Sequence, residues 1–387
     1  MTGSDSMAPP LATPLTRLLG CRYPVVQTAM GWVATAPLVI ATSNAGAFGF
    51  LAGAVMTPDE LRKEIGLVRA GTDAPFGVNF HMFQPGAAQI VDIILENSEQ
   101  VRAVSFGRGP DKGMIARFKN AGIVCMPTVG AVKHALKMVQ LGVDAVTVQG
   151  GEGGGHTGSV PTTVLLPQVL DAVNVPVVAA GGMSDGRSLA AALAYGACGI
   201  AMGTRFLMTK ESAPPEQVKQ RYVAAGTDDI TVTTKVDGIP QRMIRNQALR
   251  RIDESNTAGL WRRAVESGLR MKRLTGASAG EMLKSARGMT SHGGMSLPQA
   301  MLAAAAPMMI QRAVVDGDVE NGLMATGVVA GRLDDLPSCA DLVQSIMVEA
   351  HARLEAMSML AGATQSTALS NTQPNTQPTA SPSAGAA

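Results

Sequence analysis

VVAAGGMSDGRSLAAALAYGACGIAMGTRF, residues 177–206, contains two strands, each followed by a glycine turn, with a helix between them. The runs 177–180 and 199–202 are short and continuously apolar, which is typical of parallel strands buried on both faces. A helix is expected over the alanine-rich segment 188–195, and Gly196 would end it. This alternation of strand and helix is the repeat from which parallel α/β folds are built.

The same pattern extends back toward the N-terminus, where six further strands are predicted at intervals of about 20–35 residues. Thr57-Pro58-Asp59-Glu60 is typical of a helix start, with an N-cap, an early proline and early acids. Eight such units favour a (β/α)8 TIM barrel over an open doubly wound sheet, because no G-x-G-x-x-G follows the first strand. The predicted strands are 24–29, 48–51, 76–79, 103–106, 123–127, 145–149, 177–180 and 199–202.

The alternation of strands and helices stops after Phe206. Residues 12–211 are therefore predicted to form the main part of the barrel. Residues 212–300 are richer in Arg, Lys, Gln and Thr, and we predict a small, mostly helical inserted domain over the barrel mouth. Residues 301–362 are expected to be helices that return to the barrel. Residues 363–387 have almost no bulky apolar side chains and are expected to be a disordered C-terminal tail.

The composition excludes several classes of function. Apolar residues make up 46% and charged residues 16% of the 387 residues, which indicates a globular body. A net charge of only +2 and 3% aromatic residues predict no nucleic-acid partner and no membrane-binding patch. The four cysteines are far apart, which indicates reduced thiols in a cytoplasmic protein and no metal site. The N-terminus lacks the features of a secretory signal, and no apolar stretch is long enough to span a bilayer.

Glycines follow the last two predicted strands, at the end of the barrel where such folds have their active sites. Gly181 and Gly182 come after the seventh strand, and Gly203 and Thr204 come after the eighth. Glycine lets backbone amides approach a ligand closely, and the helix N-terminus at 185–188 would add positive potential. We therefore predict a phosphate site here. The alternative is two ordinary turns that happen to contain glycine.

The sixth strand leads into QGGEGGGHTG, residues 149–158, in which six of the ten residues are glycine. Such a run, with Gly154 and Gly155 at its centre, is expected where backbone passes close to a flat or bulky ligand. His156 is the best catalytic candidate, because an imidazole can act as a general base near neutral pH. His81 also lies near the barrel mouth but is a weaker candidate. A flexible loop with an incidental histidine is the alternative.

Other strand ends offer contacts for a flat heterocycle such as a flavin. Gln149 and Asn79 are predicted to hydrogen-bond its pyrimidine edge, because their amides both donate and accept. Met30, with the backbone of Ala29 and Gly31 on either side, is predicted to pack against its ring.

Four arginines gather in the predicted insert, at positions 242, 245, 250 and 251. Such a run is usually a solvated helix face. The alternative is a site for an anionic carrier such as the phosphates of CoA, and we assign Arg242 and Arg245 to substrate binding on that hypothesis.

In these residues the chain resembles the nitronate monooxygenase (2-nitropropane dioxygenase) flavoproteins over roughly residues 12 to 362. The resemblance implies an FMN-binding barrel with a small extra domain and His156 as the catalytic base. It also implies FMN phosphate contacts at Gly181, Gly182, Gly203 and Thr204, and flavin-ring contacts near Ala29, Met30, Asn79 and Gln149. The motifs that carry it are VVQTAMGWVA (25–34), FGVN (76–79), QGGEGGGHTG (149–158), AAGGMSDGR (179–187), AMGTRFL (201–207) and LDDLPSC (333–339).

The glycine-rich string and VDGIPQR at 236–242 are similar to a subgroup implicated in degrading the last two steroid rings as CoA thioesters. Better-known members read E-A-G-G-H, and Gly153 stands here for the alanine. The resemblance favours an FMN-dependent oxidoreductase that dehydrogenates or reduces the α,β-bond of a bulky cyclic acyl-CoA. The alternatives are oxidation of alkyl nitronates by O2 and a flavin-free phosphate-ligand barrel. NAD(P)H as electron partner and a homodimer are left open.

Overall fold

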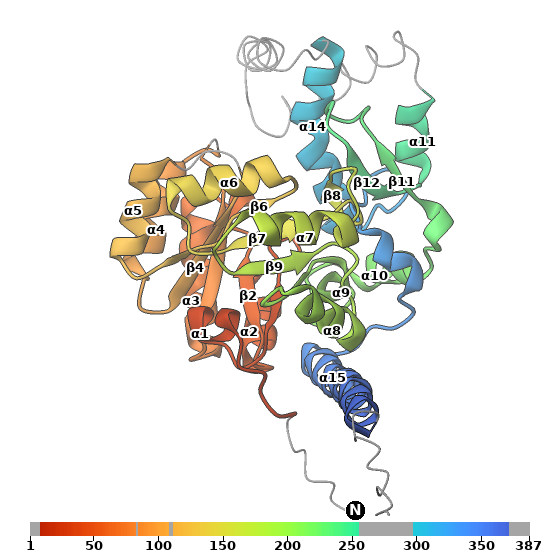
Figure 1. Ribbon diagram of the computed structural model, residues 1–387. Helices are drawn as coiled ribbons and strands as arrows, with labels where there is room; N and C mark the ends of the chain where they lie inside the picture. Colours follow the sequence, from red (N-terminus) through yellow and green to blue (C-terminus); the bar gives the residue numbers. More distant parts are fainter. Residues whose placement is uncertain (1–7, 83, 108–110, 255–296, 371–387) are drawn as a thin grey trace, which may run out of the picture.

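The computed structural model describes residues 8–82, 84–107, 111–254 and 297–370. Its main sheet has nine parallel strand segments in the order β5-β4-β3-β2-β1-β10-β9-β7-β6 (Figure 1). They are β1 (Val25–Gln27), β2 (Phe48–Leu51), β3 (Phe76–Phe80), β4 (Val101–Phe106), β5 (Val124–Cys125), β6 (Thr128–Val129), β7 (Val146–Gln149), β9 (Val177–Ala180) and β10 (Gly199–Met202).

The sheet closes into a barrel because its two end segments, β5 and β6, are one stretch of chain. Only Met126 and Pro127 separate them. Met126 donates its amide to the carbonyl of Val104 in β4, at 2.9 Å, and the Pro127 carbonyl accepts from Thr147 in β7, also at 2.9 Å. Proline has no amide hydrogen, which explains the break in the ladder. The eight predicted strands are therefore confirmed, with the fifth divided in two.

Helices cover the outside of the barrel, as Figure 1 shows. The predicted start of the helix after β2 is confirmed, because Thr57 accepts from the Glu60 amide and Glu60 reaches back to the Thr57 amide. The helices are α1 (Pro14–Leu19), α2 (Ala36–Asn44), α3 (Pro58–Gly71), α4 (Ala87–Glu96), α5 (Lys112–Asn120), α6 (Val132–Leu141), α7 (Thr162–Ala172), α8 (Gly186–Tyr195) and the short α9 (Thr204–Leu207).

The barrel interior is filled by its own buried cluster of apolar side chains. Phe48 and Phe50 of β2 meet edge to face, with ring centroids 5.2 Å apart, and pack with residues of the opposite strands. Leu15 and Leu19 of α1 belong to the same cluster and close it at one end. The interior is thus a packed core, and a ligand must bind at the mouth.

The segment after α9 contributes both helices and strands. The described part holds α10 (Glu216–Val223), the 3-10 turn η2 (Thr227–Asp229), β11 (Ile230–Thr233), β12 (Gln241–Ile244) and α11 (Gln247–Asp253). The predicted mostly helical insert did not include the two strands, which are too short to show a clear period. They form an antiparallel sheet, in the order β11-β12-β8, with β8 (Gly155–His156) from the glycine-rich loop. Residues 255–296 of the predicted insert lie outside the described residues.

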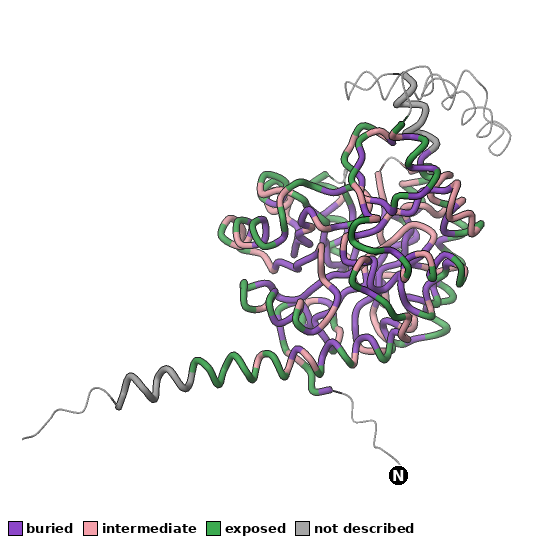
Figure 2. The backbone as a smooth tube through the Cα atoms, turned by 90° about the vertical axis from the view of Figure 1, so that its right-hand side faces the viewer, coloured by how far each residue is buried: buried purple, intermediate pink, exposed green. Residues whose placement is uncertain are grey.

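The C-terminal part returns to the barrel through α14 (Leu297–Val314), η3 (Val328–Arg332) and α15 (Cys339–Ser370). α15 packs against α8 and α2, and its far end runs away from the body of the molecule (Figure 2). The helix continues to Ser370, so the disordered tail predicted from residue 363 does not begin there. The rest of that tail, 371–387, lies outside the described residues. Among the helices of the described chain, none has the length and apolar character needed to cross a bilayer.

Candidate active site

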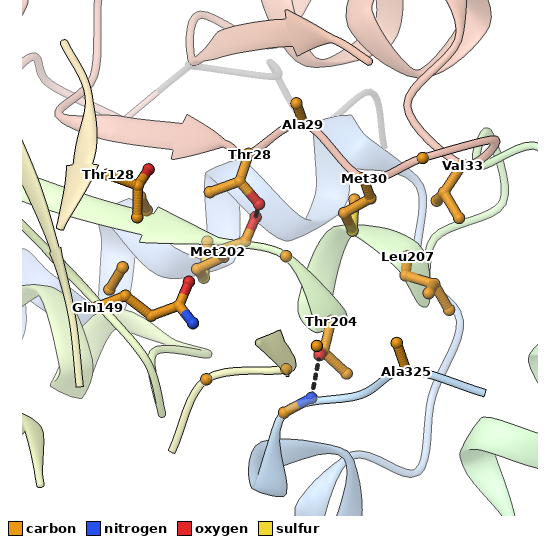
Figure 3. A pocket seen from close by; sticks show the side chains of 18 of the residues that line it. Thr28, Ala29, Met30, Val33, Thr128, Gln149, Met202, Thr204, Leu207 and Ala325 are labelled. Carbon is orange, nitrogen blue, oxygen red and sulfur yellow. Dashed lines mark hydrogen bonds between the residues drawn. The ribbon is translucent and has the colours of Figure 1, made fainter. Parts of the chain in front are cut away.

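A cavity of about 630 Å³ lies at the carboxyl ends of the barrel strands (Figure 3). Residues that follow β1, β3, β7, β9 and β10 form its wall, as expected for the mouth of a barrel. The predicted base and all of the predicted cofactor contacts meet around this one space: Ala29, Met30, Gly31, Asn79, Gln149, Gly154, Gly155, His156, Gly181, Gly182, Gly203 and Thr204.

Both glycine turns line the cavity, and in the first of them the backbone conformation itself favours glycine. Gly181 and Gly182 have φ values of +90° and +76°, in the left-handed region that other residues rarely adopt. A Cβ on Gly203 would lie 3.1 Å from Oγ1 of Thr28 and 3.5 Å from Sδ of Met30. The Thr204 hydroxyl accepts a hydrogen bond from the Gly327 amide at 2.8 Å, shown as the dashed line in Figure 3. This geometry leaves bare backbone at the cavity wall.

The N-terminus of α8 does not take part in this cradle, contrary to the prediction. Asp185 caps the helix, and its carboxylate accepts from the Ser188 amide at 3.0 Å. Glu349 of α15 accepts from the Gly186 amide at 2.9 Å. Because two carboxylates of the chain already occupy these amides, the helix end is closed to a ligand phosphate. Any phosphate at the turns must be bound without it.

Several glycines of the loop 149–158 serve packing within the protein. A Cβ on Gly150 would lie 2.0 Å from Oγ1 of Thr162, the first residue of α7. A Cβ on Gly154 would lie 2.5 Å from the backbone carbon of Thr326. The Glu152 side chain fastens the loop to α7 by accepting from the Thr162 amide and hydroxyl. The expectation that glycine here serves a ligand is therefore incomplete, because other segments of the chain also press on the loop.

His156 projects from β8 with a partner that the sequence reasoning did not find. Its Nε2 lies 2.6 Å from Oδ2 of Asp237, which sits in the connection between β11 and β12. The histidine side chain is 59% exposed and that of Asp237 only 14%. Gln149 holds the backbone in place, because its amide donates to the His156 carbonyl at 2.9 Å. Asp237 lies within VDGIPQR at 236–242, the segment that carries the resemblance to the steroid-degrading subgroup.

Asp237 is ionised at neutral pH. Burial alone would raise the pKa of its carboxyl, but the hydrogen bond and charge of His156, with the Ile239 amide, hold it below its usual range. The nearby His81 lines the same cavity. Burial lowers the pKa of His81, and the charge of His156 lowers it further, so this imidazole is neutral at neutral pH.

Two side-chain amides present acceptors to the cavity. Asn79 donates its amide hydrogen to the Ser105 carbonyl at 3.1 Å, and Gln149 donates to His156 as described above. Each amide nitrogen has a partner within the protein, and each side chain also has a carbonyl oxygen able to accept from a ligand N–H group. Such a group is present at the pyrimidine edge of a flavin.

Arg242 and Arg245 do not line this cavity. The Arg242 guanidinium donates to the carbonyls of Gly151, at 2.5 Å, and Gly153, at 3.3 Å, and so supports the glycine-rich loop. Arg245 is exposed, and its backbone amide binds the Asp229 carbonyl at 2.7 Å. The predicted role of both side chains in substrate binding stays a prediction.

The outer wall of the cavity is apolar and comes from the later part of the chain. Pro307, Ile310 and Val314 are spaced by three and four residues, so they share one face of α14. Tyr222 of α10 and Val329 of η3 complete the wall. The sequence predicted that 212–300 lies over the barrel mouth and that 301–362 returns to the barrel, but it singled out none of these residues, because an apolar helix face has no signal that separates pocket lining from core.

The model of the family described as nitronate monooxygenase matches residues 12–349. The chain is 48% identical over 355 residues to the (3aS,4S,5R,7aS)-5-hydroxy-7a-methyl-1-oxo-octahydro-1H-indene-4-carboxyl-CoA dehydrogenase of Mycobacterium tuberculosis, covering 90% of this chain and 99% of that protein. A probable nitronate monooxygenase of Staphylococcus saprophyticus is 31% identical over 291 residues, covering 63% of this chain and 81% of the relative.

Solved structures agree with the closed barrel. FabK from Thermotoga maritima superposes with a TM-score of 0.71 and 33% identity, covering 90% of this chain and 99% of that one. A nitroalkane oxidase from Streptomyces ansochromogenes superposes with a TM-score of 0.70 and 27% identity, covering 89% and 99%. The predicted family resemblance and the predicted barrel are both confirmed.

Proposed function

Because the chain belongs to the nitronate monooxygenase family, a flavin-dependent group of oxidoreductases, we propose that it is an FMN-dependent dehydrogenase of a bulky cyclic acyl-CoA. The reaction removes two hydrogens across the α,β-bond beside the thioester carbonyl. One observation carries the proposal: a single cavity joins two bare glycine turns, a histidine paired with a carboxylate, and an apolar wall.

The residues present fit FMN. The turns at Gly181 and Gly203 suit its phosphate, and the amide oxygens of Asn79 and Gln149 suit its pyrimidine edge. Met30 lies at the cavity wall where a flat ring would pack (Figure 3). The cavity of about 630 Å³ lies within the range typical of cofactor sites. When bound, FMN supplies the two-electron acceptor of the reaction.

His156 is the base in this proposal. A thioester carbonyl makes the hydrogen on the adjacent carbon acidic, and an imidazole can remove that proton near neutral pH. His156 lines the cavity and is bound to a carboxylate that can stabilise its positive charge. His81, which burial keeps neutral, is less suited to hold a proton.

The apolar wall supports a substrate with fused rings. Ile310 and Val314 of α14 and Val329 of η3 offer carbon surface, where burial of a ring contributes about 25 cal/mol per Å². The relative that is 48% identical carries in its name a saturated two-ring skeleton with the CoA thioester on a ring carbon.

Anaerobic mixing of the holoenzyme with an octahydroindene carboxyl-CoA thioester tests the proposal. The flavin absorption band should bleach as the α,β-bond is oxidised. The matching free acid is the control, since it lacks the thioester that makes the α-hydrogen acidic, and it should leave the band unchanged. No bleaching with any ring-containing CoA thioester would refute this function.

A second candidate is oxidation of alkyl nitronates by O2, which is favoured by the relatives named as probable nitronate monooxygenases. Oxygen uptake with propyl nitronate measures it directly. We expect only trace turnover, because the apolar wall leaves a small nitronate loosely held. A flavin-free barrel is the third alternative, and a colourless purified protein that ignores added FMN would favour it.

Three further expectations belong to the same proposal. The NAD(P)+/NAD(P)H couple is proposed as electron partner, and following reoxidation of the substrate-reduced flavin by NAD+ or by NADP+ tests it. A homodimer is proposed because Met357, Met359 and Leu360 of α15 are exposed, and light scattering of the purified protein tests it.

A cytoplasmic location is supported by four free cysteines, three of them buried, and fractionation of cells tests it.

A further inference from the structure

His156 is tied to the inserted segment by backbone as well as side chain. β8 pairs with β12, with Gln241 opposite His156 in the antiparallel ladder. The Thr157 amide donates to the carbonyl of Pro240 at 3.0 Å. These contacts limit where the imidazole can lie, and they bring it against Asp237, 81 positions later in the sequence.

The Asp237 carboxylate is held on both oxygens. Oδ1 accepts from the Ile239 amide at 3.1 Å, and Oδ2 lies 2.6 Å from Nε2 of His156. The side chain is 14% exposed, so water competes little for it. Its orientation is therefore set by the turn, and it presents one defined oxygen to the imidazole.

A carboxylate oxygen only accepts hydrogen bonds, so the hydrogen shared with His156 belongs to Nε2. The Gln241 amide nitrogen lies 3.2 Å from Nε2, but both groups are donors in this tautomer, so they share the Asp237 carboxylate as acceptor and do not bond each other. A neutral imidazole with its hydrogen on Nε2 has its lone pair on Nδ1.

We propose that Asp237 is a positioning residue that fixes this tautomer and so makes Nδ1 of His156 the nitrogen that takes the substrate proton. The inference rests on the proposed role of His156 as base. Asp237 touches neither substrate nor cofactor in it, and acts only through the imidazole. Among the described residues, the charged and titratable groups with a printed interaction with the His156 side chain are Asp237 and His81.

Asp237→Asn and Asp237→Ala separate this role from a merely structural one. In Asp237→Asn the amide oxygen replaces Oδ1 as acceptor for the Ile239 amide, so the NH2 group faces His156. That group donates to Nε2 and moves the imidazole hydrogen to Nδ1, where it blocks the lone pair. Asp237→Ala leaves the imidazole free to adopt either tautomer. The asparagine variant should therefore be the more damaged of the two, although it is the closer in shape.

We expect the limiting rate constant for anaerobic flavin reduction to fall on the order of 10³-fold in Asp237→Asn and about 10-fold in Asp237→Ala. The apparent Kd for the thioester should change little. The matched control is Asp253→Asn, because Asp253 accepts from the Thr233 hydroxyl in the same inserted segment without touching the site. The control should keep the limiting rate constant of the parent holoenzyme. Equal losses in the two Asp237 variants would overturn the proposal.

Nitrogen NMR of the resting holoenzyme labelled with 15N-histidine reads the tautomer without any substrate. The His156 signals, assigned by their loss in His156→Gln, should show the hydrogen on Nε2 in the parent protein and on Nδ1 in Asp237→Asn. A hydrogen on Nδ1 in the parent protein would overturn the inference even if the dehydrogenase is active. If no ring thioester bleaches the flavin, the proposed function fails, and the NMR result still decides the tautomer.

Discussion

At the scale of single residues, the chemistry of the site comes from pairs of side chains that are far apart in the sequence. His156 is exposed and polar at a cavity mouth, where a lone imidazole would sample many orientations. Asp237 restricts it with one short bond at 2.6 Å, and Gln149 restricts the backbone beneath it. The conformational entropy of the imidazole is therefore lost when the protein folds and not when a substrate binds. This is the basis of preorganised catalysis.

His156→Ala should keep its FMN but lose about 100-fold or more in the rate of flavin reduction by the ring thioester. The residues proposed to contact FMN are the glycine turns, Met30, Asn79 and Gln149, and none of these contacts needs the imidazole of His156. Stopped-flow absorbance of the anaerobic holoenzyme measures the rate. His134→Ala is the control, since His134 is exposed on α6. Equal rates in His156→Ala and the parent protein would show that the base lies elsewhere.

At the scale of elements, the glycine-rich loop joins two parts of the molecule. Its start continues β7, its middle packs on α7 through Glu152, and its end becomes β8 in the antiparallel sheet. Arg242 of β12 adds two hydrogen bonds to loop carbonyls. The loop is therefore held at three places, which contradicts the alternative of a flexible loop with an incidental histidine.

Arg242→Ala should lower kcat by about 10-fold for both the CoA thioester and the shorter pantetheine thioester, because Arg242 supports the loop. If Arg242 instead bound the nucleotide of CoA, the substitution would raise KM for the CoA thioester and leave the pantetheine thioester unaffected. Steady-state kinetics with the two thioesters distinguishes these roles. Arg62→Ala provides the comparison, since Arg62 is an exposed arginine of α3 that is paired with Asp59.

Asp185→Ala should destabilise the protein by about 1 kcal/mol at neutral pH, because it removes the cap of α8. Burial would raise the pKa of Asp185, but hydrogen bonds from Ser188 and Arg187 lower it below its usual value. A lowered folded-state pKa means that the stabilisation is present above the unfolded value, about 3.9, and is lost as pH falls through the folded pKa.

Urea unfolding of Asp185→Ala and the parent protein from neutral pH down to acid measures this difference. The gap between them should be largest near neutrality and shrink below about pH 4. Asp59→Ala is the control, because the Asp59 side chain is 96% exposed and its pair with Arg62 contributes little. A difference in the free energy of unfolding that grows toward acid pH would contradict the prediction.

At the scale of the whole molecule, the cavity exists because two parts of the chain meet. The barrel supplies the glycine turns and the polar amides, whereas α10, α14 and η3 supply the apolar wall. The inserted strands and α14 share a buried cluster, which includes Met243, Leu249 and Ala306. In the proposed function, a substrate must therefore fit between the glycine turns proposed to hold FMN and a wall built by the later chain.

Ile310→Trp should raise KM for the ring thioester about 10-fold while a short linear acyl-CoA is little affected, because the larger ring fills the space opposite the flavin site. The FMN content should stay unchanged. Val315→Trp is the matched control, since Val315 follows α14 directly and is 44% exposed. If both thioesters lose affinity equally, this wall does not select the ring.

The sequence by itself determined the eight strands, the glycine turns and the cavity residues on strand ends. Those features depend on local patterns, and closure of a barrel then brings every strand end to one mouth. The tertiary structure alone decided that Asp237 binds His156, that Asp185 and Glu349 close the end of α8, and that Ile310 faces the cavity. Each of these contacts joins segments far apart in the chain. Whether such segments come into contact depends on how whole helices and strands pack, and a local sequence pattern does not predict that packing.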